Sequence, residues 1–342
     1  MAQINKPDEY FNTVLYTGNG GTNAITGVGF QPDWVWIKNR PDAKDHQIYD
    51  SVRGTTKVIG SDRTSAEATV SNGLTAFGSD GFTVGADSNV NDNGDSHVSW
   101  NWLASNTTAS NSNGSITSTV SANTTSGFSV VSYTGTGANA TVGHGLGSAP
   151  SMIIVKNRSA VKDWVIYHKS LGNTKFLEFT TSGEQTASNR WNNTTPTNSV
   201  FSLGSDNGAN GSGNSHIAYC FAEKKGFSKF GSYTGNGNAD GTFVYTGFKP
   251  AFYMIKRTDS TGSWIIKDNK RPGYNVNGSY LVANDSLAES TGSGNVASDE
   301  LSNGFKIRGT SSSLNTSGGT YIYMAFASNP FVTSGGIPTT AR

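Results

Sequence analysis

The sequence contains little of what disulfide chemistry or nucleic-acid binding would require. Cys220 is its single cysteine, which excludes an intrachain disulfide and predicts a structural thiol. Charged residues make up 14% of the chain, against about 25% in ordinary soluble domains. The net charge is +1 and the basic residues are scattered, whereas phosphate backbones are bound by concentrated basic surfaces. We therefore expect no nucleic-acid partner.

Long apolar segments are also missing. No stretch approaches the roughly 18 consecutive apolar residues that a membrane-spanning helix needs. The first eight residues lack the apolar core of a signal peptide. We expect a soluble protein that does not insert into a membrane and is not exported by a cleaved signal.

Glycine, serine, threonine and asparagine are plentiful instead. The chain has 42 glycines among 342 residues, and 34% of its residues are hydrophobic. Such a composition is typical of many short strands joined by turns, with enough apolar material for several modest cores. It favours an all-β fold.

The motif Tyr-Thr-Gly-x-Gly occurs three times, beginning at Tyr16, Tyr133 and Tyr233, and each copy precedes a similar apolar strand. Repeats of this length predict an array of one structural unit. We predict three tandem antiparallel β-sandwich modules of jelly-roll type. Their predicted limits are 1–105 for module one, 127–223 for module two, and 224–342 for module three with a C-terminal tail. Residues 106–126, rich in serine, threonine and asparagine, are predicted to be a linker.

Part of this linker has an alternative interpretation. Within residues 116–125, the side chains of Ile116, Ser118 and Val120 would share one face of an extended segment. The segment could therefore be ordered as an added edge strand.

One strand in each module is apolar on both faces. At residues 34–38 the side chains of Trp34 and Trp36 alternate with those of Val35 and Ile37, and residues 152–155 repeat the pattern. An antiparallel strand of this kind must be covered twice. We expect it to lie centrally, or beneath a neighbouring module or subunit, and on this ground we predict a homo-oligomer.

The patterns associated with catalysis and cofactor binding are not matched. The glycine-rich stretches 18–21 and 235–237 lack the Gly-Lys-Ser/Thr of a phosphate loop and are interpreted as hairpin turns. Residues 87–95 resemble a calcium loop in composition, but the required glycine and glutamate positions are not filled. His97 and His216 occupy equivalent strand positions, so we interpret them as ordinary strand residues. We predict no enzyme, catalytic residue, cofactor or metal.

Aromatic residues supply the candidate ligand or interface positions. Trp164 and Trp264 are equivalent in modules two and three, while module one has His46 there. Ordinary core packing is the favoured interpretation of both, with a ligand or interface role as the alternative. Trp191 lies in a predicted loop without a counterpart and is the preferred candidate, because an exposed ring could stack on a sugar. Tyr253, on the second face of the doubly apolar strand in module three, is a candidate for the oligomer interface.

The chain resembles a family of Tyr-Thr-Gly repeat proteins from the virions of tailed phages, especially marine phages. Residues 28–40 carry the likeness with the sequence Val-Gly-Phe-Gln-Pro-Asp-Trp-Val-Trp-Ile-Lys-Asn-Arg, which follows the Leu-Tyr-Thr-Gly-Asn-Gly of residues 15–20. Residues 133–158 are similar in module two, as is the ending 338–342. Module three departs from the pattern, with Lys256-Arg257-Thr258 in place of Lys-Asn-Arg.

The resemblance implies a virion structural protein of a tail fibre, baseplate or capsid appendage, assembled in the host bacterial cytoplasm. Its partners would be other virion proteins and, at the host surface, a glycan. The family brings no catalytic residues to this chain. Two alternatives stay open: a carbohydrate-binding module for host adsorption, and a polysaccharide depolymerase.

Overall fold

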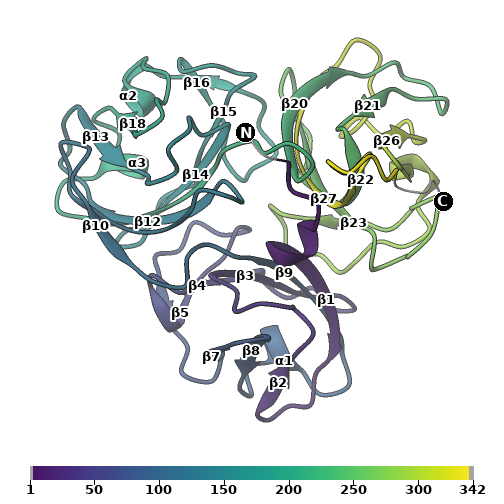
Figure 1. Ribbon diagram of the computed structural model, residues 1–342, viewed down its shortest axis with the longest axis horizontal. Coiled ribbons are helices and arrows are strands. Elements are labelled where there is room, and N and C mark those ends of the chain that lie inside the picture. Colours follow the sequence, from purple (N-terminus) through teal and green to yellow (C-terminus); the bar gives the residue numbers. More distant parts are fainter. Residues whose placement is uncertain (1–2, 339–342) are drawn as a thin grey trace.

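The computed structural model describes residues 3–338, so the predicted modules one and three are described without residues 1–2 and 339–342. It consists of three β modules arranged around a common centre, as Figure 1 shows. Each module has a large antiparallel sheet and a smaller sheet packed against one of its faces. The predicted all-β, sandwich-type fold is confirmed.

Module one comprises residues 3–105. Its large sheet has the order β1 (Phe11–Thr17), β9 (Ser96–Trp102), β3 (Trp34–Asn39), β4 (Gln47–Asp50), β5 (Gly54–Ile59) and β6 (Ala68–Thr69). The smaller sheet consists of β2 (Asn23–Ile25), β8 (Gly81–Val84) and β7 (Leu74–Gly78). The 3₁₀ helix η1 (Pro7–Glu9) precedes the first strand, and the short helix α1 (Ser88–Asn91) precedes β9.

Module two comprises residues 106–223. Its large sheet has the order β10 (Ala109–Asn111), β11 (Ser118–Asn123), β12 (Phe128–Thr134), β19 (Ser215–Phe221), β14 (Met152–Asn157) and β15 (Val165–His168). Two small pairs complete it: β13 (Ala140–Gly143) with β18 (Val200–Leu203), and β16 (Lys175–Phe176) with β17 (Gln185–Thr186). Its short helices are α2 (Ser188–Trp191) and α3 (Asn207–Asn210).

Module three comprises residues 224–338. Its large sheet has the order β20 (Ser228–Thr234), β27 (Thr320–Pro330), β22 (Phe248–Arg257), β23 (Ile265–Asp268) and β24 (Leu281–Val282). The smaller sheet consists of β21 (Phe243–Tyr245), β26 (Gly304–Ile307) and β25 (Ser298–Leu301), and the 3₁₀ helix η2 (Gly294–Val296) precedes β25.

The predicted linker at residues 106–126 is not a solvated tether. It contains β10 and β11, which extend the large sheet of module two by pairing with each other and with β12. Val120 is buried opposite Val131, and Ser118 Oγ donates to the carbonyl of Gly143 at 2.8 Å. The alternative interpretation of residues 116–125 as an added strand was correct, because buried residues on one face outweigh the polar composition, but the edge of the sheet is β10 and not this strand.

The repeated Tyr-Thr-Gly-x-Gly motif builds the same turn in every module. A Cβ on its first glycine would lie 2.0 Å from the carbonyl oxygen of Asp92 in module one, so no larger residue fits at Gly18. The second glycine, Gly20, has a φ of +68°, which L-residues with a Cβ rarely adopt. Both constraints recur at Gly135 with Gly137 and at Gly235 with Gly237.

The motif tyrosine anchors this turn to the last strand of its module. In module one the Tyr16 ring stacks on His97 with centroids 5.0 Å apart, and its hydroxyl donates to the carbonyl of Val90 at 2.6 Å. Asn91 then holds the turn by accepting from the amide of Asn19 at 2.9 Å. In modules two and three the ring contacts are Tyr133 on His216 and Tyr233 on Tyr321, and the hydroxyls donate to the carbonyls of Ala209 and Leu314. The matching asparagines, Asn210 and Asn315, accept from the amides of Thr136 and Asn236. The motif is a structural signature, as its turn-like composition predicted.

The doubly apolar strand is covered on both faces within this one chain. In β3, Val35 and Ile37 lie in the core that module one forms with its own smaller sheet. Trp34 and Trp36 face the other way and join a core shared by all three modules. The expectation of a central strand beneath neighbouring modules is confirmed. The strand consequently no longer argues for a second subunit.

The shared core is a continuous aromatic cluster at the centre of the molecule. Its middle layer contains Trp102, Phe221 and Phe326, one from the last strand of each module, whose ring centroids are 5.5 to 6.4 Å apart. Other aromatic members include Phe11, Trp34, Trp36, Trp100, Phe128, Trp164, Tyr219, Phe252 and Trp264. Each module therefore buries part of its neighbours.

Phe179 fills the position where the three modules meet at one end of this core. Its ring lies 5.9 Å from Trp36, 5.5 Å from Trp164 and 5.2 Å from Trp264, with one tryptophan contributed by each module. Modules one and three place the small residues Ser61 and Ala283 at the corresponding positions, and Ser61 Oγ donates to the carbonyl of Ala283 at 2.6 Å. A single large side chain thus occupies a space that three copies could not share.

Replacing Phe179 by alanine should lower the free energy of unfolding by about 3 to 5 kcal/mol, because it opens a cavity against all three modules. Chemical denaturation followed by tryptophan fluorescence measures the effect. Val161→Ala is the matched control, since Val161 is 68% exposed and should tolerate truncation. Equal stability of the two variants would show that Phe179 does not join the modules.

Candidate functional site

Trp191, the preferred ligand candidate from the sequence, is buried. Its side chain is 1% exposed and packs edge-on against Tyr167, with ring centroids 5.8 Å apart, in the core of module two. The prediction of an exposed loop was wrong because residues 188–191 form the short helix α2, which turns the indole inward. Trp191 is therefore not available to stack on a sugar.

Trp164 and Trp264 are buried at the contacts between modules. The indole of Trp164 donates to the carbonyl of Gly60 in module one, and that of Trp264 donates to the carbonyl of Glu178 in module two, both at 2.8 Å. His46 completes the ring, with Nε2 lying 3.0 Å from the carbonyl oxygen of Val282 in module three. The three contacts run in the same direction around the centre, so these positions connect the modules and do not face a ligand.

At the position of Trp164 and Trp264, module one has a smaller residue, and next to it a larger one than the other modules have. His46 replaces the tryptophan of the other modules, and Trp36 replaces Ile154 and Met254 on the neighbouring strand. The Trp36 indole donates to His46 Nδ1 at 2.8 Å. Burial lowers the pKa of His46 to about 3, so the ring is neutral and can accept this hydrogen bond.

Tyr253, the candidate for an oligomer interface, is buried in module three. Its ring stacks on Phe305 with centroids 4.5 Å apart, and its hydroxyl lies 2.6 Å from both Ser298 Oγ and Glu300 Oε1. Burial raises the pKa of Tyr253 well above its ordinary value. The smaller sheet of its own module covers this face, where the sequence had suggested a second subunit.

The calcium-like stretch at residues 87–95 is explained by local structure. Asp87 caps helix α1 by accepting from the amide of Asn89, as Asp206 does for α3 in module two. Asp42, Asp92 and Asp95 lie close enough to share an ion, but Lys44 Nζ already lies 2.6 Å from Asp92 Oδ2. Exposed acidic groups with such a partner do not identify a metal site.

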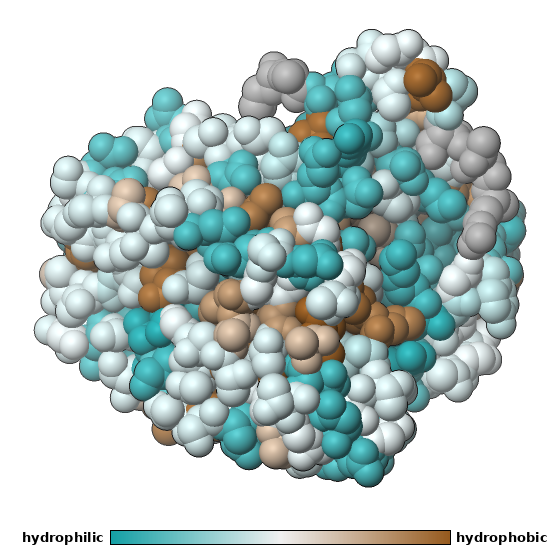
Figure 2. All heavy atoms as spheres, turned by 60° about the horizontal axis from the view of Figure 1, so that its bottom comes forward, coloured by the Kyte–Doolittle hydropathy of each residue, from teal (hydrophilic) through white to brown (hydrophobic). Residues whose placement is uncertain are grey.

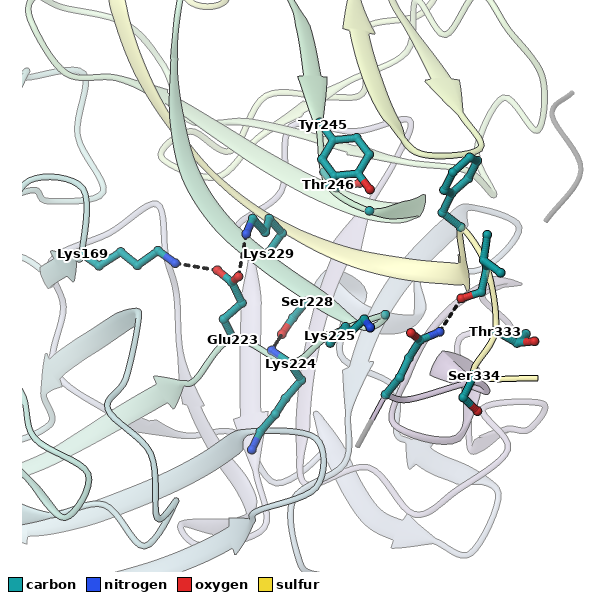
Figure 3. A pocket seen from close by; sticks show the side chains of 15 residues that line it. Lys169, Glu223, Lys224, Lys225, Ser228, Lys229, Tyr245, Thr246, Thr333 and Ser334 are labelled. Carbon is teal, nitrogen blue, oxygen red and sulfur yellow. Dashed lines mark hydrogen bonds and ion pairs between the residues drawn. The ribbon is translucent and has the colours of Figure 1, made fainter. Parts of the chain in front are cut away.

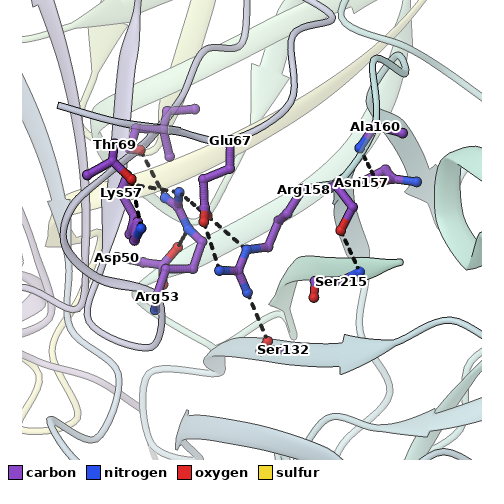
Figure 4. A network of polar contacts seen from close by, with 12 residues as sticks. Asp50, Arg53, Lys57, Glu67, Thr69, Ser132, Asn157, Arg158, Ala160 and Ser215 are labelled. Carbon is purple, nitrogen blue, oxygen red and sulfur yellow. Dashed lines mark hydrogen bonds and ion pairs between the residues drawn. The ribbon is translucent and has the colours of Figure 1, made fainter. Parts of the chain in front are cut away.

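A buried polar network connects modules one and two (Figure 4). Arg53 pairs with Asp50, and the Tyr219 hydroxyl of module two donates to Asp50 Oδ2 at 2.7 Å. Figure 4 shows Glu67 between Arg53 and Arg158, and Arg158 binds both of its carboxylate oxygens, at 2.8 and 2.9 Å. A bidentate arginine–carboxylate pair of this kind fixes the orientation of module one relative to module two.

Polar residues cover much of one face of the molecule. On the face that Figure 2 shows, hydrophilic and neutral residues predominate, and apolar residues lie near the middle and at scattered positions elsewhere.

A cleft between modules two and three is the best candidate site. Its volume is about 970 Å³. It lies between the loop after β15, the connection from β19 to β20, the end of β21 and the segment that follows β27. Figure 3 shows lysine side chains on one side and aromatic side chains on the other. The residues that line it are Gln3, Lys169, Glu223, Lys224, Lys225, Gly226, Ser228, Lys229, Tyr245, Thr246, Gly247, Phe331, Val332, Thr333 and Ser334.

The basic side of the cleft is organised by one carboxylate. Glu223 Oε2 lies 2.5 Å from Lys169 Nζ, and its Oε1 lies 2.7 Å from Lys229 Nζ. Burial alone would raise the pKa of Glu223, but the two ammonium groups lower it further than burial raises it. Lys225 is exposed beside them, whereas Lys224 extends away from this group in Figure 3, with its stem against Gly127.

The aromatic side of the cleft follows from the alternation of β21. Val244 points into the core, which turns Phe243 and Tyr245 outward. Tyr245 is 58% exposed, and Phe331 from the segment after β27 is 36% exposed. Sequence reasoning did not identify this site, although the adjacent Lys224 and Lys225 and the alternation at residues 243–245 were the available signals.

These features define a class of protein in which three β-sandwich modules of one chain close around a shared core. The chain belongs to the family described as a domain of unknown function (DUF7483), whose model matches residues 6–330. That match includes all three modules. No curated protein and no solved structure matches the chain. Among residues 3–338, no helix is both long and apolar enough to span a membrane.

Glu67→Gln should lower the free energy of unfolding at pH 7 by about 1 to 3 kcal/mol, because charged hydrogen bonds to Arg158 and Arg53 are lost. Burial raises the pKa of Glu67, but the two arginines lower it below its ordinary value overall. A depressed carboxylate pKa stabilises the folded state above about pH 4 and less so as the pH falls through the folded-state pKa.

The difference between wild type and Glu67→Gln should therefore shrink from pH 7 towards pH 3, as measured by urea unfolding at each pH. Glu9→Gln is the control, since Glu9 forms only an exposed pair with Lys6. A difference that does not depend on pH would contradict the assignment.

Proposed function

We propose that this chain is a structural component of a phage virion and forms part of an external appendage such as a tail fibre, baseplate or capsid decoration. The sequence resemblance suggests this class, and the observation that best supports it is the core shared by the three modules. An appendage must keep its shape under mechanical load. A chain whose modules bury one another meets that requirement better than separate domains on flexible linkers.

The contacts between modules support a rigid body. Hydrogen bonds from Trp164 and Trp264 and the close approach of His46 to Val282 link each module to the next. The arrangement is pseudo-threefold, so one chain presents three related sets of loops. Such a body would suit attachment to other virion proteins around a threefold axis. Association with further copies of the chain stays a prediction, now without the doubly apolar strand as its reason.

Contact with the host surface is the second function that an observation favours. The lysine and aromatic cleft is a candidate for glycan binding, which keeps the carbohydrate-binding alternative open. The depolymerase alternative makes a different prediction, namely the release of new reducing ends from host polysaccharide. We expect no such release on incubation with the purified chain.

Antibodies against the recombinant chain should label purified particles of the phage or prophage that encodes it. Immunogold electron microscopy would show at which end of the particle the label lies. Pre-immune serum and particles from an unrelated phage are the controls. A chain that is abundant in the lysate but does not occur on purified particles would overturn the proposal.

A further inference from the structure

We propose that the cleft between modules two and three binds a segment of acidic polysaccharide, with its lysines contacting sugar carboxylates and its aromatic side contacting the rings. That the polysaccharide belongs to a host surface rests on the proposed function. Binding itself rests on the cleft alone.

The charge of the cleft favours an anion. Lys169 and Lys229 flank the carboxylate of Glu223, the one acidic residue of the lining, and Lys224 and Lys225 also line the cleft. The whole chain has 25 basic and 24 acidic residues, whereas the lining of this cleft contains four lysines and one glutamate. Low-dielectric walls strengthen the attraction that such a cluster exerts on an anionic ligand.

The lysines keep hydrogen-bonding capacity for a ligand. An ammonium group has three donors, and Lys169 and Lys229 each form one ion pair with Glu223. Glu223 therefore holds both amines in place without using all their donors. Lys225 is exposed and has no ion pair with a carboxylate of the described residues. Together these groups can bind one carboxylate, or two on adjacent sugars.

The aromatic side indicates a saccharide among the possible anions. Tyr245 exposes ring surface across the cleft from the lysines in Figure 3, and the partly exposed Phe331 also lines the cleft. Rings of this kind pack against the apolar faces of sugars. Thr333 and Ser334 add hydroxyl groups that can bond sugar hydroxyls. A volume of about 970 Å³, open to solvent, accommodates a few sugar units of a longer chain.

Other polyanions fit less well. Nucleic acids are bound by extended basic surfaces that are usually rich in arginine, but arginine is absent from the lining of this cleft. An acidic peptide would satisfy the lysines but would leave the exposed aromatic rings without a matching flat partner. The saccharide is therefore the ligand that uses both sides of the cleft.

Isothermal titration of the full chain with oligogalacturonate tests the proposal, with a neutral galactan oligomer, polyglutamate and inorganic phosphate as comparison probes. We expect oligogalacturonate to bind and the neutral oligomer not to. The double variant Lys225→Gln with Lys229→Gln should weaken binding by at least about tenfold. Tyr245→Ala should weaken it by about threefold or more.

Lys162→Gln is the matched control, because Lys162 is exposed and lies outside the cleft. Unchanged melting temperatures would show that the exposed substitutions leave the fold intact. No binding of oligogalacturonate, or equal losses in Lys162→Gln and in the cleft variants, would overturn the proposal. If polyglutamate binds with the same affinity as oligogalacturonate, and Tyr245→Ala does not change that affinity, the cleft would be assigned to acidic peptides. If the chain binds oligogalacturonate but is not found on phage particles, the binding site stands and only the assignment of the polysaccharide to a host surface is removed.

Discussion

The structure depends on the need to cover large sheets that are apolar on both faces. A smaller sheet covers one face of each, but the other face carries tryptophan and phenylalanine side chains such as Trp34, Trp102 and Phe221. Exposure of such residues to water costs about 25 cal/mol for each square ångström of apolar surface. The three modules avoid this free-energy cost, because the second apolar face of each large sheet packs against those of the other two modules. The modules are consequently parts of one folding unit, even though the sequence repeats like an array of separate domains.

Closure around a common centre also explains why the repeats differ where they meet. Equivalent positions converge there, and three large side chains cannot fill the same space. Phe179 fills it alone, while Ser61 and Ala283 leave room for it. Similarly, His46 is smaller than the tryptophan of the other modules at its position, and the neighbouring Trp36 is larger than its counterparts. Repeats that look like imperfect copies are therefore complementary parts, and their differences near the centre serve packing. The proposed binding cleft lies outside this shared core, chiefly between residues of modules two and three.

Local features of the fold could be predicted from the sequence. The alternation of residues 34–38 and the glycines of the repeated motif identified strands and turns, because these depend on neighbours along the chain. The burial of Trp191 was missed because the short helix α2, which turns its ring into the core of module two, was not predicted. The contacts of Trp164 and Trp264 with neighbouring modules could not be predicted, since they depend on how the modules pack together. The cleft was missed for the same reason: Lys169, Glu223 and Phe331 are distant in sequence and meet only in the folded chain. The virion function is a proposal, which the shared core supports but does not test.

Differential scanning calorimetry of the intact chain tests the central claim most directly. If the shared core makes one cooperative unit, the chain should unfold in a single transition whose calorimetric and van't Hoff enthalpies agree. Two or three resolved transitions, or a calorimetric enthalpy about three times the van't Hoff value, would show that the modules unfold independently and would contradict the account.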